Sequence, residues 1–172
     1  GRVTGNVTID GAGSTWAIGR DFASGGQASL TLAPNPNGTA NVTLSNGGSL
    51  TITGARATPA TDNSLPFLNL SSSAGATSTV TVTTGASIVF GGDTGVLNIG
   101  GNIAATGGTG TMNITAGGTV SGTGANGLSF VSVGRSLGTG TLNISGAGSQ
   151  LVIAGVGGVN TGLDGNAGLM YV

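Results

Sequence analysis

Apolar and polar residues alternate in short runs along this chain, and the runs return in a fixed order. The run Val7-Thr8-Ile9 is the first of five with the pattern apolar, polar, apolar. A period of two residues is typical of a β-strand with one buried face. The sequence therefore predicts a first strand in each of five repeat units, at Val7-Thr8-Ile9, Val42-Thr43-Leu44, Val80-Thr81-Val82, Met112-Asn113-Ile114 and Leu142-Asn143-Ile144.

Each repeat unit continues in the same way after its first strand. A corner of small residues follows, as at Gly11-Ala12-Gly13-Ser14, where glycine permits the positive φ of a sharp bend. Two further strands are then predicted. The second strands are expected at Trp16-Ala17-Ile18, Leu50-Thr51-Ile52, Ile88-Val89-Phe90, Val120-Ser121-Gly122 and Leu151-Val152-Ile153. The third strands are expected at Leu30-Thr31-Leu32, Leu68-Asn69-Leu70, Leu97-Asn98-Ile99, Val131-Ser132-Val133 and Met170-Tyr171-Val172.

The spacing of the repeat units indicates how they are assembled. Successive first strands start 35, 38, 32 and 30 residues apart. Repeats of this size are typical of solenoids, and the uneven spacing fits strands in fixed register joined by loops of variable length. No stretch has the 3.6-residue apolar period of an amphipathic helix, so no helix is expected. We predict an all-β fold for residues 1–172: a single domain that forms a right-handed, three-faced parallel β-helix (β-solenoid) of about five turns.

The predicted β-helix places its polar residues in outward ladders. Strands of neighbouring turns pair about 4.8 Å apart, so equivalent side chains stack in columns. The apolar columns are expected inside, and Trp16, which occupies one of them, is expected in the core or as an end cap. One outward ladder is expected at Thr8, Thr43, Thr81, Asn113 and Asn143, and another at Thr31, Asn69, Asn98, Ser132 and Tyr171.

The composition narrows the classes of function. The chain of 172 residues has 37 glycines, a net charge of -1, and no lysine, glutamate, histidine or cysteine. Without a basic surface, no nucleic-acid partner is expected. Without cysteine, the fold has no disulfide and depends on packing and hydrogen bonds. We find no transmembrane run and no signal peptide. Both ends of the sequence have strand character, which suggests a cut from a longer repetitive protein or ends left open for stacking.

The same composition argues against an enzyme. A Ser-His-Asp triad and a histidine-based metal site need residues that the chain lacks. Parallel β-helices that process polysaccharides use clustered aspartates on one face, with lysine or arginine. Here the aspartates fall in different units and at unlike positions, so we predict no catalytic, cofactor-binding or metal-binding residue. They are Asp10, Asp21, Asp62, Asp93 and Asp164.

Two further motifs have plainer interpretations. Gly91–Gly95 and Leu163–Asn166 are similar to calcium-binding Gly/Asp nonapeptides, but the nonapeptide is not tandem, so turns are expected. Thr79–Thr83 and Thr51–Thr53 are similar to the T-x-T arrays of ice-binding β-solenoids. Because the same column changes to asparagine in the last two units, we interpret these threonines as ordinary exposed ladder positions.

Three connections depart from the repeat, at Ala33–Asn37, Ala55–Pro66 and Ala154–Gly168. Loops carry function more often than the elements they connect. Ala55–Pro66 carries both Arg56 and Asp62. We interpret the three connections as solvated linkers around the β-helix.

The repeats resemble those of bacterial autotransporter passenger domains. The resemblance is carried by Val7–Trp16, by Gly138–Ser149 and by the unit ending Val133-Gly134. It covers nearly the whole chain and is poorest at Ala55–Pro66. It implies a secreted β-helix stalk at the bacterial cell surface, anchored through an outer-membrane β-barrel that is absent from this sequence, and it implies no activity by itself.

Two functions are therefore expected. The first is a structural or adhesive surface-exposed β-helix of an autotransporter-like protein, extracellular, without a cofactor, whose partner is a host-surface or glycan receptor. The alternative is a self-assembling extracellular filament subunit, since open β-edges at both ends of a solenoid allow self-association. A third class, a polysaccharide-processing enzyme, requires aspartate and arginine side chains to converge on one face.

Overall fold

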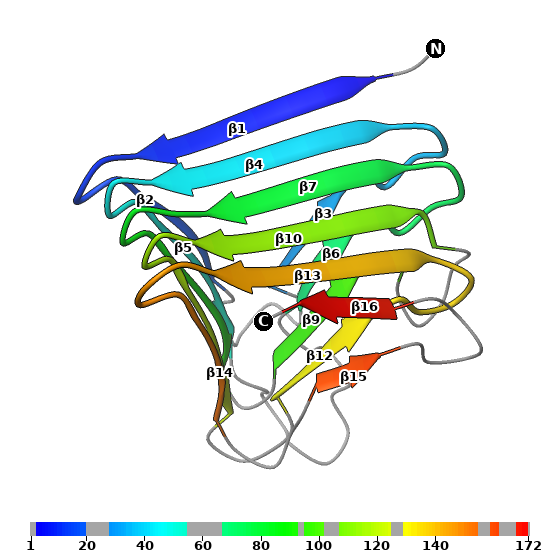
Figure 1. The fold of residues 1–172 in the computed structure, drawn as a ribbon. Coiled ribbons are helices and arrows are strands. Elements are labelled where there is room, and N and C mark those ends of the chain that lie inside the picture. The colour runs from blue at the N-terminus through cyan, green and yellow to red at the C-terminus, as the bar shows by residue number, and fades with distance from the viewer. Residues whose placement is uncertain are drawn as a thin grey trace.

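The computed structural model describes eight ranges of the chain: residues 3–19, 28–54, 67–92, 95–101, 107–124, 129–154, 159–161 and 168–171. These residues form a β-solenoid of three parallel sheets and include no helix. Figure 1 shows the strands of each sheet stacked one above the other, in the order of the repeat units, from the N-terminal end to the C-terminal end.

Each repeat unit contributes one strand to each sheet, so strands three apart in the sequence are neighbours. Sheet A consists of β1 (Thr4–Asp10), β4 (Thr39–Ser45), β7 (Thr77–Val82), β10 (Thr109–Thr115), β13 (Thr139–Ser145) and β16 (Gly168–Tyr171). Sheet B consists of β2 (Thr15–Gly19), β5 (Ser49–Gly54), β8 (Ser87–Gly92), β11 (Thr119–Gly124) and β14 (Gln150–Ile153). Sheet C consists of β3 (Ser29–Leu32), β6 (Phe67–Leu70), β9 (Gly95–Ile99), β12 (Ser129–Val133) and β15 (Val159–Thr161).

The strand register agrees with the predicted alignment of the repeats. In sheet A, Val7 pairs with Val42, and the column continues without a slip through the later units. In sheet B, Trp16 pairs with Leu50, and in sheet C, Leu30 pairs with Leu68. A slip of one residue would turn every apolar side chain outward, so burial of one face fixes this register.

The last predicted third strand is an exception and was wrong. Met170 and Tyr171 belong to β16, which pairs with β13 in sheet A, so Met170 lies next to Leu142. The third strand of the fifth unit is β15, in which Val159 pairs with Val131. Both segments have the apolar–polar pattern of a half-buried strand, so alternation alone did not distinguish them. Tyr171 consequently joins the row of Asn143 in sheet A, and Val172 lies outside the described residues.

The three sheets enclose a continuous aliphatic core. Leucine, isoleucine and valine from all three sheets are almost fully buried, and Phe90 is the largest buried side chain. The Phe90 ring lies over Gly122 of the next unit, where an added Cβ would come within 2.8 Å of the ring Cζ. Trp16 is half-buried and packs against this core, which agrees with its predicted position in the core or as an end cap.

The corners between sheets A and B are short and use left-handed backbone conformations. In the second unit Asn46 and Gly47 have φ values of 51° and 82°. In the first unit the corner is one residue longer, and Gly11 and Gly13 have φ values of 92° and 88°. Glycine adopts such angles without steric cost, so the small-residue corners of the repeat are the sharp bends that the sequence predicted.

Candidate functional site

The exposed outer surface of sheet A is the most regular surface of the described molecule. Its side chains come from alternate positions of β1, β4, β7, β10 and β13, because the intervening residues face the core. We call this surface the threonine face, and we define it by three columns. They are Thr4–Thr39–Thr77–Thr109–Thr139, Asn6–Asn41–Thr79–Thr111–Thr141 and Thr8–Thr43–Thr81–Asn113–Asn143.

All the side chains of the threonine face are exposed or half-exposed, and none of them is charged. The third column is the outward ladder that the sequence predicted at Thr8, and its register is confirmed. A hydrogen bond joins the two asparagines of this column, in which Nδ2 of Asn143 donates to Oδ1 of Asn113 over 2.8 Å. The second column has a similar pair, in which Nδ2 of Asn41 donates to Oδ1 of Asn6 over 2.9 Å.

One carboxylate borders the threonine face. Asp10 ends β1, and its Oδ1 accepts hydrogen bonds from Ser45 Oγ over 2.5 Å and from Asn46 Nδ2 over 2.8 Å. Both bonds favour the ionised carboxylate, so they lower the pKa of Asp10 below its ordinary value of 3.8. Asp10 is therefore a structural link between the first two repeat units, and its charge lies at the margin of the face.

The outer surface of sheet C differs from the predicted ladder. The column Thr31–Asn69–Asn98–Ser132 has the expected register, but its last three members are buried rather than exposed. Asn98 Nδ2 donates to Asn69 Oδ1 over 2.6 Å. Two buried atoms of this column, Asn98 Oδ1 and Ser132 Oγ, have no hydrogen-bond partner among the described residues. Because three members of this column are buried, sheet C does not present the exposed polar ladder that the sequence predicted.

The outer surface of sheet B is exposed but irregular. Its column Ala17–Thr51–Val89–Ser121–Val152 mixes apolar and hydroxyl side chains. Val152 at its end is 47% exposed. Sheet B therefore lacks the repeated chemistry of the threonine face and offers a natural comparison for it.

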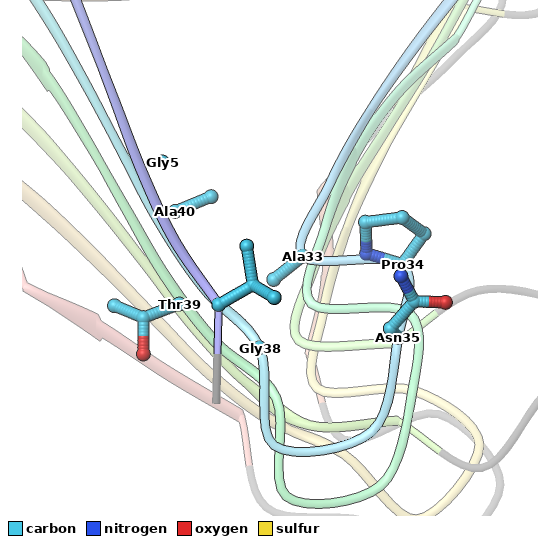
Figure 2. A pocket seen from close by; sticks show the side chains of 8 residues that line it. Gly5, Ala33, Pro34, Asn35, Gly38, Thr39 and Ala40 are labelled. Atoms are coloured by element: carbon cyan, nitrogen blue, oxygen red, sulfur yellow. The ribbon is translucent and has the colours of Figure 1, made fainter. Parts of the chain in front are cut away.

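The N-terminal end of the solenoid leaves part of its apolar interior open. Val7 faces inward but is 37% exposed, whereas Val42 in the same column is 2% exposed. A pocket of about 190 Å³ lies at this end, between the start of β1 and β4 and the corner that joins β3 to β4. Figure 2 shows Ala33 and Pro34 on that corner, across from Ala40 on β4.

This pocket is lined by apolar and small uncharged residues and holds no group suited to catalysis. Pro34 and Asn35 belong to the predicted linker Ala33–Asn37, which the structure places as a short corner stacked on the next one. Asn37 N donates to Ala74 O of that next corner over 3.3 Å. The corner is therefore one of a stack of hydrogen-bonded corners, and the pocket lies beside the first of them.

The structure places few of the chain's charged residues. Among the described residues these are Asp10 and Arg135, which belong to the first and fourth repeat units and to different corners. Within the same ranges no group of acidic, histidine or cysteine side chains could hold a metal ion. The remaining charged residues lie outside the described ranges: Arg2, Arg20, Asp21, Arg56, Asp62, Asp93 and Asp164.

The remaining predicted motifs are placed only in part. Thr79–Thr83 covers the end of β7, whereas Gly91 and Gly92 are strand residues of β8 rather than turn residues. The connection Ala55–Pro66, the segment Leu163–Asn166 and most of Ala154–Gly168 lie outside the described residues. In the part of the chain that is described, no helix is long and apolar enough to cross a membrane. No family model, curated protein or solved structure matches this chain.

Proposed function

We propose that this chain is a structural and adhesive β-helix of an autotransporter-like secreted protein, displayed at the bacterial cell surface. In this proposal the β-helix is right-handed, as parallel crossovers favour. It has about five turns. The observation that carries the proposal is the threonine face, an exposed uncharged surface on sheet A of a three-sheet solenoid with a buried aliphatic core. In this function the core keeps the rod rigid, and the face makes contact with a receptor or surface.

We also propose that the chain has no catalytic activity and needs no cofactor. The sequence lacks histidine, cysteine, lysine and glutamate, which supply most general bases and nucleophiles. Asp10, the one described carboxylate, already accepts two hydrogen bonds that keep it ionised. Adhesion through the threonine face therefore has better support than catalysis.

Surface display tests the proposed function directly. The chain is fused to an outer-membrane β-barrel anchor, exposure is checked by protease treatment of intact cells, and adhesion is measured on glycan arrays and host cells. We expect display to increase adhesion and Thr111→Lys to reduce it, because lysine places a charge in the middle column of the threonine face. Ser121→Lys is the matched control, since Ser121 is half-exposed on sheet B in the same repeat unit.

The outcomes of this experiment separate the stalk from the adhesive surface. Adhesion that is unchanged by Thr111→Lys would assign the contact to another surface and leave the chain a stalk. A displayed chain that is shown to be accessible but increases adhesion to none of these targets would contradict the adhesive function.

As a second function we propose end-to-end assembly into a filament through unpaired strand edges. Val7 is exposed although it belongs to an inward column, and none of the described strands pairs with the outer edge of β1. Another chain could continue the column there, because β16 already extends sheet A in register at the other end. Unpaired strand edges promote such association.

Electron microscopy and light scattering over a concentration series distinguish the two functions. A filament subunit is expected to give uniform fibres, and Val7→Lys is expected to prevent them by placing a charge at the open column. Val152→Lys is the control, because it adds the same charge to an exposed valine on the outside of sheet B. A monodisperse monomer at all concentrations would rule out the filament and leave the stalk and adhesive function.

A further inference from the structure

The first column of the threonine face is an unbroken row of five threonines. The register pairs Thr4 with Thr39, Thr39 with Thr77, Thr77 with Thr109 and Thr109 with Thr139. The asparagines that interrupt the T-x-T pattern in sequence belong to the other two columns. Each of the five strands consequently carries at least two outward threonines, and β7 carries three.

The threonines form a two-dimensional array rather than a single row. Neighbouring strands of a sheet are spaced about 4.8 Å apart, and alternate residues of one strand are about 6.7 Å apart. Parallel pairing without a slip keeps both spacings constant from β1 to β13. Threonine is β-branched and stiff at χ1, so its hydroxyl and methyl groups hold their positions better than those of a longer side chain.

The hydroxyl groups of this array, apart from that of Thr39, remain available to a ligand. Thr39 has an interaction of its own, but the other threonines of the three columns make no hydrogen bond through their side chains in the described part of the chain. A threonine hydroxyl has one donor and two acceptor positions. Each of these hydroxyl groups can therefore hydrogen-bond to water, and water bound there would be spaced as the strands of the sheet are.

Charge also restricts the class of ligand. The face has no charged side chain, and Asp10 lies at its margin with its carboxylate bonded to Ser45 and Asn46. A charged partner would therefore find no counter-charge here. From β1 to β13 the three columns also contain no aromatic side chain, the residue type that commonly provides large contact area in binding sites. The row of Asn143 continues to Tyr171 only in β16. These two observations favour an uncharged, periodic ligand that binds through hydrogen bonds.

We propose that the threonine face binds the surface of ice. Ice is an uncharged lattice of water molecules with a fixed repeat in two directions, and ordered water on a rigid hydroxyl array can join such a lattice. This proposal rests on the part of the proposed function that makes the threonine face the adhesive surface, and it is independent of how the chain is displayed. The hydrogen-bonded asparagine pairs occupy the first two rows of the middle column, at Asn6–Asn41, and the last two rows of the third column, at Asn113–Asn143. The central row, on β7, consists of threonine alone.

The test measures retention of the purified chain in a slowly growing ice hemisphere and the shape of single ice crystals in its presence. We expect the chain to enter the ice and to give faceted crystals. Thr79→Tyr, at the centre of the face, is expected to abolish both effects because the ring rises above the array. Thr51→Tyr is the matched control, since Thr51 is half-exposed on the outside of sheet B, and it is expected to retain both effects.

Circular dichroism and melting temperatures of both variants establish that they are folded before they are compared. If the unmodified chain is excluded from ice, the proposal is overturned. It is also overturned if folded Thr79→Tyr and Thr51→Tyr lose retention equally. Adhesion to glycans or host cells in the display experiment, together with exclusion from ice, would preserve the proposed function and reject ice as the ligand.

Discussion

Glycine is required at the corners between sheets A and B for two different reasons. Gly85 has a φ of 69° and open space around the position of a Cβ, so only its backbone conformation disfavours a side chain. At Gly118 an added Cβ would lie 2.2 Å from the carbonyl oxygen of Val82 in the unit above. The second constraint is the stricter one, because the backbone of a neighbouring repeat unit must move to relieve it.

This difference predicts unequal costs for two similar substitutions. Gly118→Ala is expected to lower the free energy of unfolding by about 3 kcal/mol, through overpacking against backbone. Gly85→Ala is expected to cost only about 1 kcal/mol, the strain of a left-handed alanine. Urea unfolding of both variants measures the difference, and equal losses would contradict the close packing of the corners.

Asp10 makes the stability of the first two repeat units depend on pH. Its pKa is lowered in the folded state by Ser45 and Asn46, so its contribution is present above the unfolded pKa and is lost as pH falls through the folded pKa. Melting temperatures from about pH 6 to about pH 2 should therefore fall more for the unmodified chain than for Asp10→Asn. Parallel curves for the two proteins would show that these hydrogen bonds do not stabilise the carboxylate.

At the scale of the strand, one inward column of sheet B contains side chains of very different size. Phe90 of β8 stands above Gly122 of β11, and Ile153 of β14 approaches the same space from the other side. Apolar alternation predicted β11 correctly but gave no reason for a glycine at an inward position. The reason is the size of the phenylalanine in the neighbouring unit, which only the register makes visible.

The Phe90–Gly122 pair predicts a non-additive double mutant. Gly122→Ala alone is expected to destabilise the fold by about 2 kcal/mol, because its methyl group meets the phenylalanine ring. Phe90→Leu shortens the side chain, so the same alanine should cost clearly less in the Phe90→Leu background. A double-mutant cycle from urea unfolding measures this coupling, and additive losses would mean that the two residues do not share the space.

The strands, their phase and their register were predictable because alternation and glycine corners recur in every unit. The assignment of Met170 failed because Val159-Asn160-Thr161 has an equally strand-like pattern, and no local signal orders the two segments. The burial of Asn69 and Asn98 was not predictable, since alternation shows which residues share a face but not whether that face is covered. The unbroken threonine column required the complete register of sheet A, because its members lie three residues before the strands that the pattern identified.

At the scale of the whole molecule, each repeat unit contacts the units before and after it, so end units have fewer stabilising neighbours than central ones. β7 pairs with β4 and β10, whereas among the described strands β1 pairs with β4 alone. Amide hydrogen exchange is therefore expected to be slowest in β7 and faster in β1, where the column is already open at Val7. Equal protection along sheet A would indicate that the solenoid unfolds only as one unit, or that β1 is covered in solution.

The corners from sheet A to sheet B and those from sheet B to sheet C differ in how much their lengths vary between repeat units. The connections from sheet A to sheet B contain three or four residues in every unit, whereas those from sheet B to sheet C range from two residues, 93–94, to twelve, 55–66. The strands on either side keep their register across this range. Insertions and deletions in the gene can therefore accumulate at this corner without disturbing the stack. The same corner is the natural place to graft a foreign epitope or an affinity tag, and the corner from sheet A to sheet B is the place to avoid.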